Sequence, residues 1–147
     1  MIAEMLKPIE ILLVEDNLGD IRLTQDALTN GKVRNNLHVV RDGVEAMDFL
    51  FKRGEFKNAI RPDLILLDLN LPKKDGREVL NEIKNDEILK TIPVVILTVS
   101  KAEEDILKAY NLHANCYITK PLNLSQFIEV VKAIECFWLT IVKLPPK

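Results

Sequence analysis

The sequence lacks several features that are typical of zinc-binding, disulfide-rich, membrane or secreted proteins. It has two cysteines, Cys116 and Cys136, without the close spacing of a zinc site or the density of a disulfide-stapled domain. We therefore expect reduced, buried thiols in a cytoplasmic protein. No apolar run approaches the roughly 20 residues of a membrane helix. The first seven residues include an acid and lack the apolar core of a signal peptide.

An excess of one charge is also lacking. The net charge is -2, and acids and bases are mixed along the chain. Because nucleic-acid binding normally needs a strongly basic face, we expect no nucleic-acid partner. A chain of 147 residues suffices for one domain with a single core. We expect this domain to span residues 9–139, between tails of residues 1–8 and 140–147, with no DNA-binding output domain.

Five short apolar segments alternate with five amphipathic ones. The apolar segments predict strands at Ile9–Val14, Leu37–Val40, Leu64–Leu67, Ile92–Leu97 and Cys116–Thr119. Their apolar runs are continuous, which indicates strands buried on both faces. Helical stripes follow Asn17, Gly43, Gly76, Lys101 and Asn123, and the second stripe includes Phe51. This alternation is typical of an α/β fold in which helices cover both faces of a parallel sheet.

Polar residues follow four of these strands: Glu15 and Asp16 the first, Asp68 the third, Thr98 the fourth and Lys120 the fifth. The carboxyl ends of parallel strands open at one edge of the sheet, so we expect these residues at a common rim. Each of them alone is explained as a helix cap or a solvated residue. Their combination at one rim is what indicates a functional site.

Three clustered carboxylates repel one another unless a cation lies among them. One lysine cannot balance three acids, so we predict Mg²⁺ held by Glu15, Asp16, Asp68 and a nearby backbone carbonyl. A metal, a lysine and a hydroxyl around a carboxylate favour phosphoryl transfer. Asp68 would be the nucleophile that forms an acyl phosphate. Lys120 would neutralise the added oxygens, and Thr98 would donate a hydrogen bond to one of them.

These motifs, in this register, resemble the receiver domain of two-component response regulators from Ile9 to Trp138. The matching positions include Asn70 and Pro72 behind Asp68, then Gly76, and Tyr117 three residues before Lys120-Pro121. The resemblance implies a flavodoxin-like, doubly wound sheet of five parallel strands in the order 2-1-3-4-5. It also implies a phosphoacceptor switch rather than an enzyme with a released product.

The resemblance also implies a role for individual residues. Asp68 would accept a phosphoryl group from a histidine kinase, and the backbone carbonyl of Asn70 would be a further metal ligand. Thr98 and Tyr117 would form the switch pair. The Lys120-Pro121 bond would be cis, which places Pro121 in a tight functional turn.

A narrower resemblance concerns the regulators that partner phytochrome histidine kinases. It rests on residues Arg61–Leu80, on the long connection Lys52–Ile60, and on Phe137-Trp138 through Lys143-Leu144-Pro145. Those relatives are stand-alone receivers of cyanobacteria and other bacteria. The resemblance implies a phytochrome-type kinase as the partner of this chain, and a role in light signalling.

One departure from the family pattern concerns the lifetime of the phosphoryl group. Val99 stands where the family usually has alanine or another small residue, and its bulk should narrow access to the phosphoryl group. Asn70 and Ser100 are expected to flank the attacking water, and neither is a strong base. We therefore predict slow autodephosphorylation.

The last predicted helix, Leu124–Trp138, is apolar nearly all round, so its second side must be covered. We expect a homodimer through the face formed by this helix, the strand Cys116–Thr119 and the helix that carries Tyr110. The candidate interface residues are Tyr110, Ile128, Phe137, Trp138 and Ile141. A tail that folds back over this side is the alternative.

Other functions fit the sequence less well. An aspartyl-phosphate phosphohydrolase needs a general acid two residues after its nucleophile, where this chain has Asn70. A flavin or nucleotide module needs amide donors after the first strand, where Glu15-Asp16 would repel phosphate. An unphosphorylated scaffold, or pseudo-receiver, would not need the acids, Thr98 and Lys120.

Overall fold

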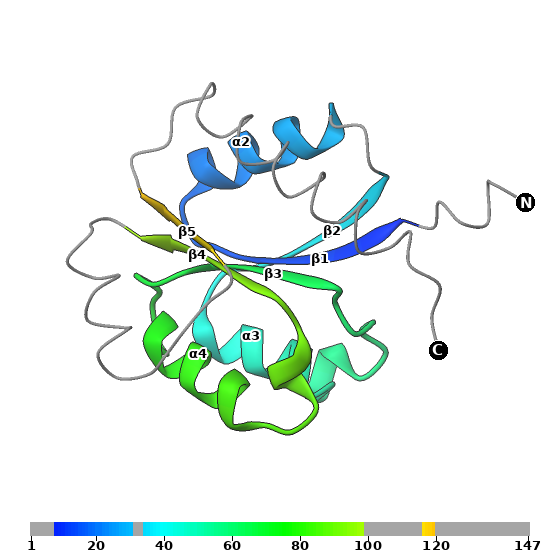
Figure 1. Ribbon diagram of the computed structural model, residues 1–147, viewed down its shortest axis with the longest axis vertical. Helices are drawn as coiled ribbons and strands as arrows, with labels where there is room; N and C mark the ends of the chain where they lie inside the picture. The colour runs from blue at the N-terminus through cyan, green and yellow to red at the C-terminus, as the bar shows by residue number, and fades with distance from the viewer. Residues whose placement is uncertain (1–7, 31–33, 99–115, 120–147) are drawn as a thin grey trace, which may run out of the picture.

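The computed structural model describes residues 8–30, 34–98 and 116–119. Its five strands form one sheet in the order β2-β1-β3-β4-β5 (Figure 1), and every pair of neighbouring strands is parallel. The strands are β1 (Ile9–Val14), β2 (Asn35–Val40), β3 (Leu64–Asp68), β4 (Val94–Thr98) and β5 (Cys116–Thr119). The predicted fold class, strand number and strand order are therefore confirmed.

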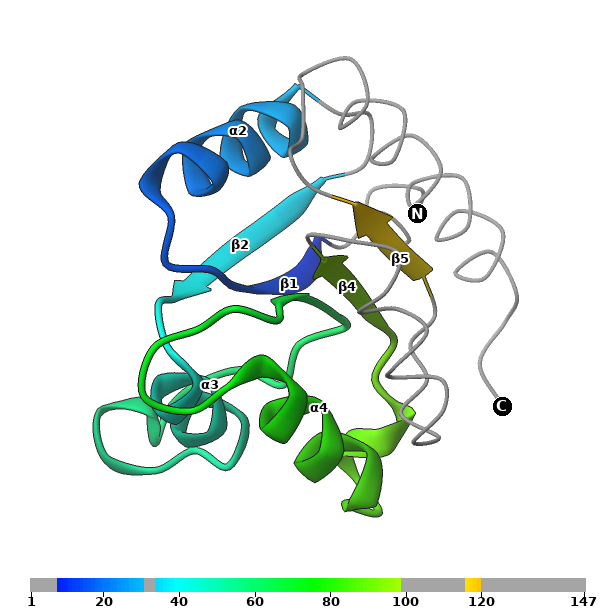
Figure 2. The ribbon, with the colours of Figure 1, turned by 90° about the vertical axis from the view of Figure 1, so that its left-hand side faces the viewer.

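Helices lie on both faces of the sheet. In Figures 1 and 2, α2 (Leu18–Thr29) lies on one face, and α3 (Gly43–Leu50) and α4 (Gly76–Asn85) lie on the other. Two short 3₁₀ helices, η1 (Gly54–Phe56) and η2 (Leu89–Thr91), connect these helices to the next strands. None of the helices in the described ranges has the length and apolar character needed to cross a membrane.

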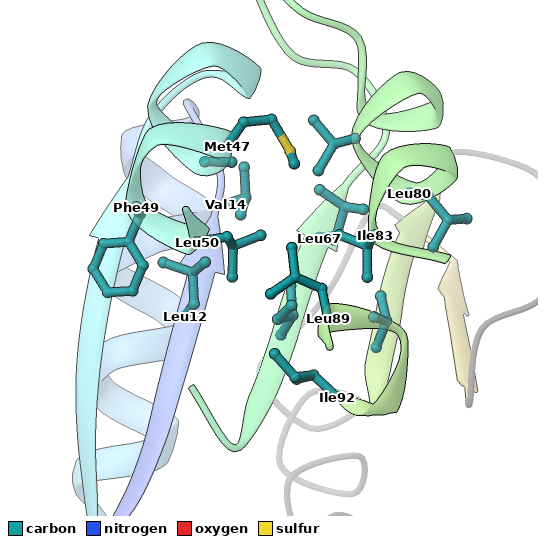
Figure 3. Packing of buried hydrophobic residues seen from close by; sticks show 14 of the residues in the cluster. Leu12, Val14, Met47, Phe49, Leu50, Leu67, Leu80, Ile83, Leu89 and Ile92 are labelled. Carbon is teal, nitrogen blue, oxygen red and sulfur yellow. The ribbon is translucent and has the colours of Figure 1, made fainter. Parts of the chain in front are cut away.

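Each face of the sheet has its own hydrophobic core. The larger core joins alternate residues of the central strands to α3 and α4 (Figure 3), and Leu12, Ile65, Leu67 and Ile83 are fully buried in it. The smaller core joins the other residues of these strands to α2. Burial of one such side chain contributes about 1.5–3 kcal/mol. Both faces of β3 are covered, which explains its continuous apolar run.

Three strands differ from their predicted bounds, and β3 does so only by ending at Asp68 rather than Leu67. β2 begins at Asn35 rather than Leu37, because Asn35 already pairs with Ile9 of β1. The apolar pattern did not predict this start because Asn35 and Asn36 are polar. In the structure their side chains are satisfied: Asn35 donates to the carbonyl of Leu28 and Asn36 to the Glu10 carboxylate. β4 begins at Val94 rather than Ile92.

The predicted stripe of α3 was wrong at its end. The helix ends at Leu50, and Phe51 is exposed, with the guanidinium of Arg53 4.7 Å from its ring centre. Phe49 is buried instead and packs against the rings of His38 and Phe56. The helix stops here because Lys52 has a left-handed backbone, with φ of 57°. The predicted helices after Lys101 and over Leu124–Trp138 lie outside the described residues.

Candidate metal and phosphoryl site

The first two acids of the site stand between the end of β1 and the start of α2. The Glu15 amide still donates to the carbonyl of Val40, so this residue extends the pairing of β1 with β2. The Glu15 side chain is fully buried, and its Oε2 accepts from the Asn17 amide at 3.2 Å. Asn17 caps α2 by accepting a hydrogen bond from the Asp20 amide. Both ends of this loop are therefore fixed by regular structure.

The third acid, Asp68, is the last residue of β3 and is only 2% exposed. β3 lies in the centre of the sheet between β1 and β4, with Val14 opposite Leu67 and Leu97 opposite Asp68. The Oδ1 atom of Asp68 accepts from the Asn70 amide at 3.1 Å. The backbone of Asp68 is thus paired with β4 on one side, and on the other it directly follows the last pair that β3 makes with β1.

The fold brings the three predicted carboxylates together. One carboxylate oxygen from each of Glu15, Asp16 and Asp68 lies within 4.8 Å of the other two. Glu15 and Asp68 are buried and Asp16 is partly exposed, so the cluster opens to solvent on the side of Asp16. Carboxylate oxygens are hard ligands that suit Mg²⁺. The donor set of this cluster therefore fits the predicted metal.

A close backbone contact fixes the turn after Asp68. The Gly76 amide donates to the carbonyl of Leu69 at 3.0 Å, which brings the start of α4 against the end of β3. A Cβ atom on Gly76 would lie 2.4 Å from the carbonyl oxygen of Asp68. Asp75 and Glu78 cap α4 in a capping box. Sequence reasoning missed this box, although an acid followed three residues later by glutamate is its known pattern.

The loop between β2 and α3 contacts both acid-bearing loops, and sequence reasoning missed this as well. The Arg41 guanidinium donates to the carbonyl of Asp16 at 3.0 Å. On the other side, the Asp42 carboxylate lies 3.5 Å from the ammonium of Lys73, in the loop after Asp68. No short pattern signals these contacts, because they join residues that are at least 25 positions apart.

Lys74 fixes the far side of the loop after Asp68. Its ammonium pairs with the Glu82 carboxylate on α4, and this hydrogen bond raises the pKa of Lys74 above its usual value. The ammonium therefore stays charged throughout the neutral range, and the loop remains tied to α4.

Comparison with known proteins decides the family. The family model of the response regulator receiver domain matches residues 11–132. The chain belongs to this family. Its acidic cluster at the ends of β1 and β3 is thus the cluster of a receiver domain.

Similar proteins include several regulators of the same size. Response regulator Rcp1 of Synechocystis sp. is 54% identical over 138 residues, which are 94% of each chain. The crystal structure of the phosphorylated cyanobacterial phytochrome response regulator RcpA superimposes with a TM-score of 0.83. The two sequences are 60% identical, and the match covers 95% of this chain and all of the RcpA chain. The Mn²⁺-bound structure of Rcp1 has a TM-score of 0.81 at 54% identity, with the same coverage.

The structure of this receiver places the backbone of two further predicted site residues. Thr98 is the last residue of β4, one position beyond the partner of Asp68, and it pairs with Thr119. Tyr117 pairs with Ile96 in the edge strand β5. The position of Thr98 at the carboxyl end of β4 agrees with the predicted rim. Asn70 is exposed at the start of the loop after Asp68, and its carbonyl remains a predicted ligand.

The other predicted functional residues lie outside the described residues, and their roles stay predictions. They are Val99, Ser100, Lys120, Pro121 and the interface residues Tyr110, Ile128, Phe137, Trp138 and Ile141.

Proposed function

We propose that this chain is a response regulator that accepts a phosphoryl group onto Asp68 from a phytochrome-type histidine kinase, with Mg²⁺ as cofactor. The observation that carries the proposal is the cluster of three carboxylates, whose oxygen atoms lie within 4.8 Å of one another at the ends of β1 and β3. The receiver family consists of phosphoacceptor switches, and such a cluster would be costly to maintain without a cation.

The residues divide the reaction between them. A carboxylate oxygen of Asp68 attacks the phosphorus of the kinase phosphohistidine, so that a P–O bond forms as the P–N bond breaks. The histidine leaves as neutral imidazole because its other ring nitrogen already carries a proton and keeps it. Glu15, Asp16 and the carbonyl of Asn70 would hold Mg²⁺ beside Asp68. The bound ion would supply positive charge for the phosphoryl oxygens. Lys120 would neutralise the same oxygens, and Thr98 would donate a hydrogen bond to one of them.

Magnesium is favoured by the ligands. The described cluster offers only carboxylate oxygens, without the histidine or cysteine that would select a softer metal. A relative binds Mn²⁺ in its crystal structure, and Mn²⁺ accepts the same oxygen ligands as Mg²⁺. We infer Mg²⁺ as the working ion and Mn²⁺ as a suitable probe.

The partner is inferred from the relatives. RcpA, at 60% identity, is a phytochrome response regulator and was crystallised in its phosphorylated form. We infer a phytochrome-type kinase for this chain too, and we place the reaction in the cytoplasm, where a kinase has access to ATP.

The output of the switch would be a change in binding affinity. A phosphoryl group adds charge and acceptor oxygens to the rim, and Thr98 would turn toward it while Tyr117 fills the space that Thr98 leaves. The two forms must differ in affinity for a partner if the phosphate is to act as a signal. We propose a homodimer through β5 and the helices that flank it in the sequence. Sedimentation of the phosphorylated and unphosphorylated protein at micromolar concentration tests this proposal. It would be contradicted if both forms were monomeric.

Phosphorylation is tested with acetyl phosphate and Mg²⁺, followed by intact mass. We expect one added phosphate in the wild type and none in Asp68→Asn or in the presence of EDTA. Asp63→Asn and Asp75→Asn are matched controls that should keep the phosphate. Asp63 accepts from the Glu10 amide and Asp75 caps α4, and asparagine retains the acceptor that both roles need. Phosphate on Asp68→Asn would overturn the assignment.

The lifetime of the phosphoaspartate is a separate test. We expect slow loss of the phosphoryl group from the isolated protein and faster loss from Val99→Ala, because a smaller side chain admits water. A half-life of seconds for the wild type would contradict the proposed shielding.

A further inference from the structure

We propose that Arg41 is a positioning residue for the metal site, because it holds the backbone of the loop that carries Glu15 and Asp16. This inference rests on the proposed metal site and adds to it a residue that provides no ligand. Arg41 lies at the end of β2, outside the acidic cluster, and its guanidinium Nη2 donates to the Asp16 carbonyl at 3.0 Å.

The contact fixes the part of Asp16 that matters for metal binding. The accepting oxygen belongs to the peptide group between Asp16 and Asn17, which is planar. The hydrogen bond therefore restrains the rotation of this peptide group about the Cα atom that carries the Asp16 carboxylate. Other contacts of this loop within the described residues act at neighbouring points: Glu15 pairs with Val40, and Asn17 caps α2. Asp16, the more exposed of the three acids, is the one that gains most from a further restraint.

Arg41 can exert this restraint because its own backbone is anchored. Its amide donates to Oε1 of Glu45 at 2.9 Å, within the first turn of α3. The next residue, Asp42, is 6% exposed and caps α3 by accepting from the Glu45 amide. The helix is held in turn by Ala46 and Met47 in the larger core. The arginine thus connects a helix that packs on the larger core to the loop that carries Glu15 and Asp16.

The same short segment also holds the loop on the other side of the site. The Gly43 amide donates to the carbonyl of Pro72 at 3.5 Å, and a Cβ atom on Gly43 would lie 2.0 Å from the carbonyl oxygen of Lys74. Both loops that carry the acids therefore contact residues 41–43. Arg41 is the member of this segment that contacts the β1 loop with its side chain.

The sign of the effect separates positioning from simple charge. A guanidinium near a cation site repels the cation, so loss of the charge alone would tighten metal binding. Loss of a positioning hydrogen bond would weaken binding in spite of the removed charge, by roughly two- to tenfold. The two explanations therefore predict opposite changes in the dissociation constant.

Calorimetric titration with Mn²⁺ measures this constant in Arg41→Gln, Arg41→Lys and the control Arg53→Gln. Arg53 follows the other end of α3 and pairs with Asp48 at 3.8 Å, so its replacement removes the same charge away from the site. We expect weaker binding in Arg41→Gln, an intermediate value in Arg41→Lys, and no change in Arg53→Gln. At saturating Mg²⁺, the phosphorylation rate of Arg41→Gln should return to that of the wild type.

The outcomes distinguish this inference from the proposed function. Equal or tighter Mn²⁺ binding in Arg41→Gln, with a wild type that binds Mn²⁺ and is phosphorylated, overturns the role of Arg41 alone. A wild type that binds no Mn²⁺ overturns the metal site itself. A fall in melting temperature without a change in the dissociation constant shows a merely structural role, and it also overturns the proposal. If Arg41→Gln does not fold, Arg41→Lys decides, because it keeps the charge and changes only the hydrogen-bonding geometry.

Discussion

Replacement of Gly76 by alanine should damage both the stability of the protein and its phosphorylation. The added Cβ would lie 2.4 Å from the carbonyl oxygen of Asp68, 2.6 Å from the Cα of Leu69 and 2.9 Å from the carbonyl oxygen of Leu69. All three atoms belong to the backbone, so no side-chain rotation relieves the contact. The shortest distance is about 1 Å less than the 3.4 Å at which ordinary contact begins.

The magnitude follows from two opposing effects. Alanine in a helix is normally more stable than glycine by about 0.5–1 kcal/mol. Overpacking of a well-packed site costs about 1–3 kcal/mol. The strand cannot yield, because Asp68 pairs with Leu97 in the centre of the sheet and Leu69 is fully buried. The start of α4 must therefore move, which strains the hydrogen bond from Gly76 to Leu69. We expect a net loss of about 1–2 kcal/mol.

Urea unfolding followed by circular dichroism measures the loss, and acetyl phosphate labelling measures the effect on Asp68. Gly54→Ala is the matched control. Gly54 has a φ of 55°, and its Cβ would meet nothing within 4 Å. Alanine there costs about 1 kcal/mol through backbone conformation alone. We expect both variants to lose stability, but only Gly76→Ala to be phosphorylated more slowly. Wild-type stability and rate in Gly76→Ala would refute the reasoning.

Three further predictions concern the core and two ionisable groups. Ile83→Ala should lower the free energy of unfolding by about 2–5 kcal/mol in urea, because Ile83 is fully buried in the larger core. The hydrogen bond from His38 lowers the pKa of Glu10 below 4.5, so its contribution to stability is present above that pH and is lost as the pH falls through the folded-state pKa. Acid unfolding of Glu10→Gln should therefore show a smaller stability change below pH 4.5, and an unchanged acid profile would contradict this. Burial lowers the pKa of Lys84 from 10.5, so Lys84→Met should raise the urea midpoint of unfolding at pH 7. This increase in the midpoint should shrink as the pH approaches 10.5, because the folded wild type then loses the buried charge and regains stability.

The sequence was most informative where one physical constraint dominated. Four consecutive aliphatic residues before Asp68 allow little except a strand covered on both faces, and β3 is such a strand. Parallel strands then bring their carboxyl ends to one edge, so Glu15, Asp16 and Asp68 could be predicted to meet.

Features that depend on tertiary contacts were harder to predict. Phe49 and Phe51 are equally apolar, and the stop at Leu50 determines which of them is buried. The polar Asn35 and Asn36 do not look like strand residues, yet their amides find partners only once β1 and α2 are in place. The contact of Arg41 with the Asp16 carbonyl joins two loops that are unrelated in sequence. Such a contact follows from the fold and cannot be read from a local pattern.

The connection before β3 offers a place to engineer a reporter. Lys57, Asn58 and Ile60 are exposed there, between η1 and the amino end of β3. Asp68 stands at the opposite end of this five-residue strand, roughly 13 Å from Leu64 at about 3.3 Å per residue. A fluorescent domain inserted at Asn58 would therefore lie before the amino end of the strand that carries Asp68, away from the acidic cluster. The buried strand β3 would then separate the optical label from Asp68.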